Sequence, residues 1–103
     1  MSLKPLAFIY VSQGADPERD HTVFYSQQHA MAIYGVPTIE EGCQVAQKIV
    51  QEGCKIIELC GGFGPEGAEQ VIRAIGGVVP VGYIYYSPEE NEKRRLQKLA
   101  EMA

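Results

Sequence analysis

The feature that most constrains the fold is an alternation of strand-like and helix-like segments through the middle of the chain. Residues 29–36 and 55–60 are rich in β-forming side chains, whereas residues 39–52 have the spacing of an amphipathic helix. A second helical pattern over residues 65–75 precedes a last strand-like run over residues 78–86. The order strand, helix, strand, helix, strand makes two consecutive βαβ units, which favour parallel strands and right-handed crossovers. We therefore predict an α/β fold with a mainly parallel sheet.

Capping residues mark where two of the predicted helices begin. Thr38 is followed three residues later by Glu41, and Ser87 is followed by Glu90 at the same spacing. This spacing is a capping box, in which the hydroxyl accepts a hydrogen bond from a free backbone N–H group. The first helix should end at Gly53, and the second capping box predicts a C-terminal helix.

The N-terminal part adds a strand and a hairpin. Residues 6–11 form a short apolar run, a turn-rich loop follows over residues 13–20, and residues 21–26 pair with residues 29–36 as a hairpin. The sheet should then have four to five strands. A length of 103 residues suits one domain, residues 1–103.

Several candidate site residues should meet at one edge of this sheet. If the strand from His21 is antiparallel, the other strands point the same way and their carboxyl ends share the edge where open α/β sheets bind ligands. His21 joins this edge, whereas His29 should lie at the opposite end. The edge collects Asp16, His21, Thr38, Cys60, Gly61, Gly62, Phe63, Gly64 and Ser87.

The most informative local signal is the glycine-rich turn at residues 61–67, which Pro65 follows into a helix. Glycines let a backbone approach a ligand closely, and a helix N-terminus directs free N–H groups at an anion. We predict that Gly61, Gly62, Phe63 and Gly64 bind an anionic group, with Thr38 and Ser87 as further ligand-binding candidates. The alternative is that the glycines only permit a tight turn.

Four residues support a catalytic alternative. Cys60 precedes a helix N-terminus, which favours the thiolate, and His21 with Asp16 could serve as its base and orienting group. Glu58 lies between Ile57 and Leu59, so we expect it to be buried, either paired structurally or acting as a general acid or base. Cys60 could equally be a small buried hydrophobic residue.

Charge and composition exclude several classes of protein. The net charge of −4 disfavours nucleic-acid binding, and no apolar run is long enough for a membrane span. Cys43, Cys54 and Cys60 are an odd number without C-x-x-C spacing, so we predict neither a disulfide framework nor a metal site. No cofactor is implied, and a cytoplasmic location is expected.

One segment resembles a known family. Residues 57–64, Ile-Glu-Leu-Cys-Gly-Gly-Phe-Gly, together with residues 79–82, Val-Pro-Val-Gly, resemble a family of small α/β proteins that is a domain of unknown function. The resemblance covers nearly the whole chain. It implies the fold and a single-domain architecture, and it assigns no catalytic role.

Counting layers predicts self-association. Two right-handed crossovers that advance in one direction place both helices on the same face, leaving only the C-terminal helix for the other. Its apolar residues are too few to cover a sheet: Leu96, Leu99, Ala100 and Ala103. The exposed aromatic residues should be Phe8, Tyr10, Tyr34, Tyr83 and Tyr85 or Tyr86. We expect a homo-oligomer that buries tyrosines of the last strand.

Three functions remain open from the sequence. The first is a module that binds a small anionic or phosphorylated metabolite at the turn of residues 61–67. The second is a small enzyme that uses Cys60 or Glu58 with His21. The third is a structural or regulatory subunit without a ligand.

Overall fold

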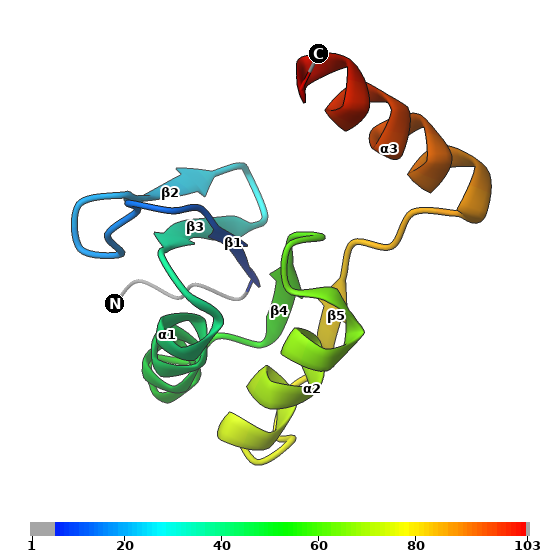
Figure 1. The fold of residues 1–103 in the computed structure, drawn as a ribbon. Coiled ribbons are helices and arrows are strands. Elements are labelled where there is room, and N and C mark those ends of the chain that lie inside the picture. The colour runs from blue at the N-terminus through cyan, green and yellow to red at the C-terminus, as the bar shows by residue number, and fades with distance from the viewer. Residues whose placement is uncertain (1–5, 103) are drawn as a thin grey trace.

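The computed structural model describes residues 6–102, which form one five-stranded sheet and three helices (Figure 1). The predicted α/β class, the N-terminal strand and hairpin, and the C-terminal helix are confirmed. In chain order the elements are β1 (Leu6–Val11), β2 (His21–Tyr25), β3 (Ala30–Val36), α1 (Ile39–Gln51), β4 (Ile56–Leu59), α2 (Gly64–Ala74), β5 (Val81–Tyr83) and α3 (Pro88–Met102).

The sheet has the strand order β2-β3-β1-β4-β5. The neighbours β3, β1, β4 and β5 all pair in parallel, and only β2 is antiparallel, to β3. Because β1 lies between β3 and β4, the first crossover passes over β1 before the second crossover continues to β5. The carboxyl ends of the four parallel strands therefore share one edge, as predicted, and His29 lies at the opposite end beside the β2–β3 turn.

One face of the sheet carries the hydrophobic core. Alternate residues of the strands point to this face, and α1 and α2 both pack on it (Figure 1). The prediction that both crossover helices share a face is confirmed. The core includes Ala7, Ile9, Ala32, Tyr34, Val36, Ile57 and Leu59 from the strands, and Val45, Ala46, Ile49, Ala68 and Val71 from the helices.

The opposite face has no helix on it within residues 6–102. It carries the alternate strand positions, among them Phe8, Ile33 and Glu58, in register with one another across the sheet. Helix α3 stands apart from the sheet (Figure 1), and none of its residues is buried. The structure therefore leaves one sheet face open.

Two tyrosines lie on a different face from the one expected. Tyr34 is 5% exposed and belongs to the core, because it is in register with Ile9 of β1. Tyr83 is in register with Leu59, so it also points to the face that carries the helices, at the edge of the sheet. The expectation that both lie on the uncovered face is wrong, whereas Phe8 and Tyr10 do lie there.

The last strand is shorter than predicted. Only residues 81–83 of the expected 78–86 form β5. Gly76 and Gly77 adopt positive φ angles in the preceding turn, and Pro80 has no N–H group to donate to the sheet. Since β4 itself has only four residues, it offers Tyr85 and Tyr86 no pairing partner, and the chain leaves the sheet.

Candidate functional site

A cavity of about 360 Å³ lies where β2 begins, between the loop of residues 12–20 and α1. It opens on the side of the sheet that carries the helices. Its lining comes from the loop, from β2, from β3 and from one side of α1. These residues are Pro17, Glu18, His21, Tyr34, Gln44, Val45, Lys48 and Glu52.

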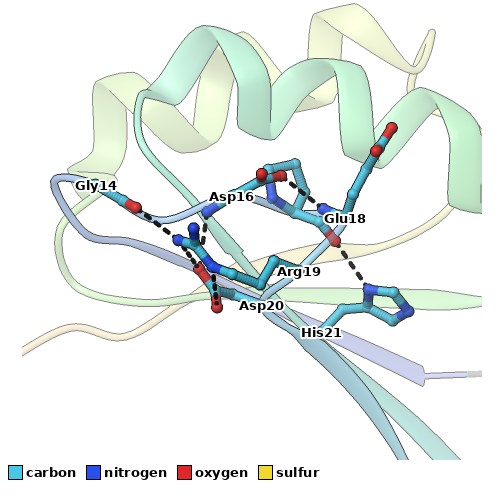
Figure 2. A network of polar contacts seen from close by, with 7 residues as sticks. Gly14, Asp16, Glu18, Arg19, Asp20 and His21 are labelled. Atoms are coloured by element: carbon cyan, nitrogen blue, oxygen red, sulfur yellow. Dashed lines mark hydrogen bonds and ion pairs between the residues drawn. The ribbon is translucent and has the colours of Figure 1, made fainter.

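The loop beside this cavity is held by a network of hydrogen bonds centred on Arg19 (Figure 2). The Arg19 guanidinium donates to the Gly14 carbonyl at 2.9 Å and to the Asp20 carboxylate at 2.8 Å. Asp20 also accepts from the backbone N–H of Asp16, and Asp16 accepts from the N–H of Glu18. The hydrogen bond from Arg19, and then that from the Asp16 backbone, lowers the pKa of Asp20 below its usual value. The network gives the loop one defined shape.

The His21 ring is fixed on two sides. Its Nδ1 atom lies 2.9 Å from the carbonyl oxygen of Pro17, a contact that Figure 2 shows. A carbonyl oxygen only accepts hydrogen bonds, so Nδ1 is the donor in this contact and Nε2 is left for a ligand. The ring also stacks on Tyr34, with centroids 5.3 Å apart. His21 is thus an oriented hydrogen-bonding group.

Helix α1 supplies the other polar groups of the cavity. Gln44, Lys48 and Glu52 are four residues apart, so they share one side of the helix, and Val45 adds apolar surface. Lys48 takes part in no ion pair within residues 6–102. Its ammonium group is therefore free to meet an anion.

The glycine turn after β4 is explained largely by packing. Gly64 has a φ angle of +64°, a backbone conformation that residues other than glycine rarely adopt. A Cβ atom at Gly61 would lie 3.4 Å from the Tyr86 ring. The backbone N–H groups of Phe63 and Gly64 donate within the turn, to the carbonyls of Cys60 and Gly61. These two N–H groups are thus already engaged.

Phe63 lies in the core rather than at the surface. Its side chain is 3% exposed, and its ring fills the space beside Gly42 of α1 and Gly67 of α2. A Cβ atom at Gly42 would come within 2.8 Å of that ring. Phe63 therefore joins the two helices, and contact with a ligand would need the core to open.

The structure does not bring Cys60 and His21 together. Cys60 follows β4 and its Sγ accepts a hydrogen bond from the N–H of Val11 at 3.3 Å, whereas His21 begins β2. Strands β2 and β4 are three strand spacings apart, each of about 4.8 Å. Asp16 bonds the loop backbone, while His21 bonds Pro17.

Glu58 is exposed, so the expectation that it is buried is wrong. It is in register with Phe8 of β1 and Gly82 of β5 on the open face. Because β4 is covered on one face only, Ile57 and Leu59 point to the core and Glu58 points to solvent.

Thr38 and Ser87 both cap helices, as the sequence predicts. The Thr38 hydroxyl accepts from the N–H of Glu41 at 3.1 Å, and the Ser87 hydroxyl accepts from the N–H of Glu90 at 3.4 Å. Their hydroxyl groups are therefore used within the fold.

Sequence reasoning named His21 as a candidate but did not name the α1 residues that line the same cavity. The spacing of Gln44, Lys48 and Glu52 was the available signal, because residues four apart share one side of a helix. Nothing local in the sequence places that side against the loop of residues 12–20.

In the described part of the chain, no three His, Cys, Asp or Glu residues lie together as metal ligands, and no helix is long and apolar enough to cross a membrane. No curated protein and no solved structure matches the chain significantly. One family model matches residues 4–98, nearly the whole chain, which confirms the expected resemblance to an uncharacterised family. The chain belongs to the family of unknown function DUF6506.

Proposed function

We propose that this protein is a binding module for a small molecule with an anionic group, and that the ligand occupies the cavity between the loop of residues 12–20 and α1. The observation that carries the proposal is the pairing of Lys48, whose charge is free, with His21, whose ring is fixed by Pro17 and Tyr34. Preorganised polar groups on an apolar wall are typical of ligand sites.

The size and charge of the cavity limit the ligand. About 360 Å³ is near the lower end of the usual range for ligand pockets, so a small metabolite fits better than a dinucleotide. Glu18 and Glu52 also line the cavity. They favour a ligand that carries hydroxyl or amino donors beside its anionic group, because carboxylates accept hydrogen bonds and repel further anions.

This cavity supports ligand binding better than the glycine turn of residues 61–64 does. Two of the N–H groups of that turn are engaged internally, and Phe63 is buried. The nucleophilic alternative has less support, because Cys60 follows β4 and His21 begins β2, three strand spacings away.

The test is a thermal-shift screen of small hydroxycarboxylates and phosphorylated metabolites. A ligand that binds the native state raises stability by about 2.7 kcal/mol at 100 times its Kd. Lys48→Gln should abolish the shift that a hit produces, because it removes the cation from the cavity. Lys55→Gln removes the same charge from an exposed position outside the cavity and should leave the shift unchanged.

Two results would contradict the proposal. One is a screen without a stabilising compound. The other is a hit whose shift is the same in native protein and in Lys48→Gln, because that ligand would bind elsewhere.

A further inference from the structure

The chain exposes more surface than a compact monomer of its mass. Its accessible surface is 6980 Å², whereas a folded monomer of 11.3 kDa exposes roughly 5,700 Å². The excess of about 1,300 Å² exceeds the roughly 800 Å² that each partner buries in a standard interface. The radius of gyration, 14.7 Å, is also larger than the roughly 12.8 Å of a compact chain of this length.

Part of the excess belongs to a C-terminal arm, residues 84–102. Leu96, Leu99 and Met102 are 52%, 50% and 82% exposed, and α3 has no buried residue. Leu96 and Leu99 are three residues apart, so they form one apolar stripe on the helix. Such a helix buries little apolar surface against its own chain, and its apolar side packs on no other element of the described residues.

A second unpartnered surface is the open face of the sheet. Its strand positions carry large apolar side chains, and no helix within residues 6–102 covers them. Glu58 lies on the same face, in register with Phe8 on one side and Gly82 on the other, and forms no ion pair within the described residues. The apolar residues of this face include Phe8, Tyr10, Met31, Ile33 and Ile56.

The root of the arm directs α3 away from its own sheet. The N–H of Ile84 donates to the carbonyl of Leu59, and the Tyr86 ring lies against Gly61. The guanidinium carbon of Arg94 in turn lies 4.4 Å from the centroid of the Tyr86 ring. These contacts hold the first two turns of α3 at the edge of the sheet, where Figure 1 shows the helix projecting outward.

We propose that two copies of this chain form a dimer in which α3 of each copy packs on the open sheet face of the other. The occupant is a second copy because one chain carries both surfaces, and reciprocal exchange closes a two-fold assembly. Charge allows the contact: Arg95, which is paired with Glu92 in the single chain, flanks the Leu96–Leu99 stripe, and Glu58 is the acidic group within the apolar face. The excess area is sufficient for such an interface.

Sedimentation equilibrium at micromolar concentration tests the dimer directly. The native protein should have twice the 11.3 kDa mass of one chain. Leu99→Glu should weaken association by at least about tenfold, because it places a charge in the apolar contact. Gln97→Glu adds the same charge outside the leucine stripe and should leave the dimer intact. Both side chains are exposed in the single chain, so folding should not depend on either.

Contacts between chains provide the second readout. In a sample that mixes isotope-labelled and unlabelled protein, filtered NOEs should connect the methyl groups of Leu96 and Leu99 with those of Met31 and Ile33. A native mass of 11.3 kDa overturns the proposal. A dimer that Leu99→Glu leaves unchanged, or one without these NOEs, overturns the exchange of α3.

Discussion

At the scale of single residues, the glycines of the turn after β4 have separate roles. Gly64 needs its positive φ angle of +64°, whereas Gly62 has no such angle, and a Cβ atom there would meet only ordinary contacts at 3.4 Å and beyond. The sequence pattern alone treats the two as equivalent members of an anion cradle. The backbone distinguishes them.

Gly64→Ala should therefore destabilise the protein by about 1 to 2 kcal/mol, the usual cost of the left-handed conformation for a side chain. Gly62→Ala should change the free energy of unfolding by less than about 0.5 kcal/mol. Urea unfolding of the two variants measures both values. Equal losses in stability would contradict the assignment of the strain to Gly64.

Two thiols, the buried Cys54 and the half-buried Cys43, predict how stability depends on alkaline pH. Burial raises the pKa of Cys54 and, with the charge of Glu40 as a smaller cause, that of Cys43. The native state therefore holds thiol protons that the unfolded state releases. The stability that the protonated thiols provide is present below the unfolded thiol pKa of roughly 8.5 and is lost as the pH rises through the native value.

We expect the free energy of unfolding to fall as the pH rises above about 8.5. Cys54→Ala should reduce this pH dependence, although the smaller side chain lowers stability at every pH. Urea unfolding between pH 7 and 9.5 gives the slopes. An identical slope in native protein and in Cys54→Ala would show that the Cys54 proton is not responsible.

At the scale of elements, β4 shows how the sheet is built. Ile57 and Leu59 point to α1 and α2, and Glu58 between them points to the open face. Leu59→Ala should cost about 2 to 5 kcal/mol because it leaves a cavity in the core. Glu58→Gln should change stability by less than about 0.5 kcal/mol, since the carboxylate is exposed. Thermal and urea unfolding compare the two, and a large loss in Glu58→Gln would contradict this orientation.

The helices and the hairpin could be predicted from sequence because their signals are local. Thr38 and Ser87 cap their helices within four residues, and the spacing of apolar residues in α1 repeats every turn. The parallel direction of the later strands follows from the crossover rule. The ends and the apolar faces of these elements are determined by residues that are close together in the sequence.

The strand order, and the face of the sheet on which each side chain lies, depend on pairing between strands that are far apart in the sequence. They could therefore not be predicted from local sequence patterns. Tyr34 belongs to the core because of its register with Ile9, twenty-five positions earlier in the chain. The expectation that Glu58 is buried assumed a strand covered on both sides, and here one side is open. His21 was placed at the correct edge, but Lys48 joins it only through the packing of α1 beside the loop.

At the scale of the whole molecule, the two faces of the sheet differ in what packs on them. One face holds the core and, at its edge, the cavity with His21 and Lys48. The other is open and, in the dimer that we propose, receives α3 of a second copy. The melting temperature should then rise with protein concentration, because dissociation accompanies unfolding. Calorimetry over a hundredfold range of concentration checks this, and a constant melting temperature would contradict it.

The most direct test of the proposed function is an NMR titration of labelled protein with a compound that stabilises it in the thermal screen. We predict that chemical-shift changes concentrate at His21, Gln44 and Lys48, which line one cavity. The His21 ring signals should move with the same affinity as the Lys48 amide. Shift changes that concentrate instead at residues 61–64, with His21 and Lys48 unaffected, would contradict binding in this cavity. They would show that the ligand binds at the glycine turn.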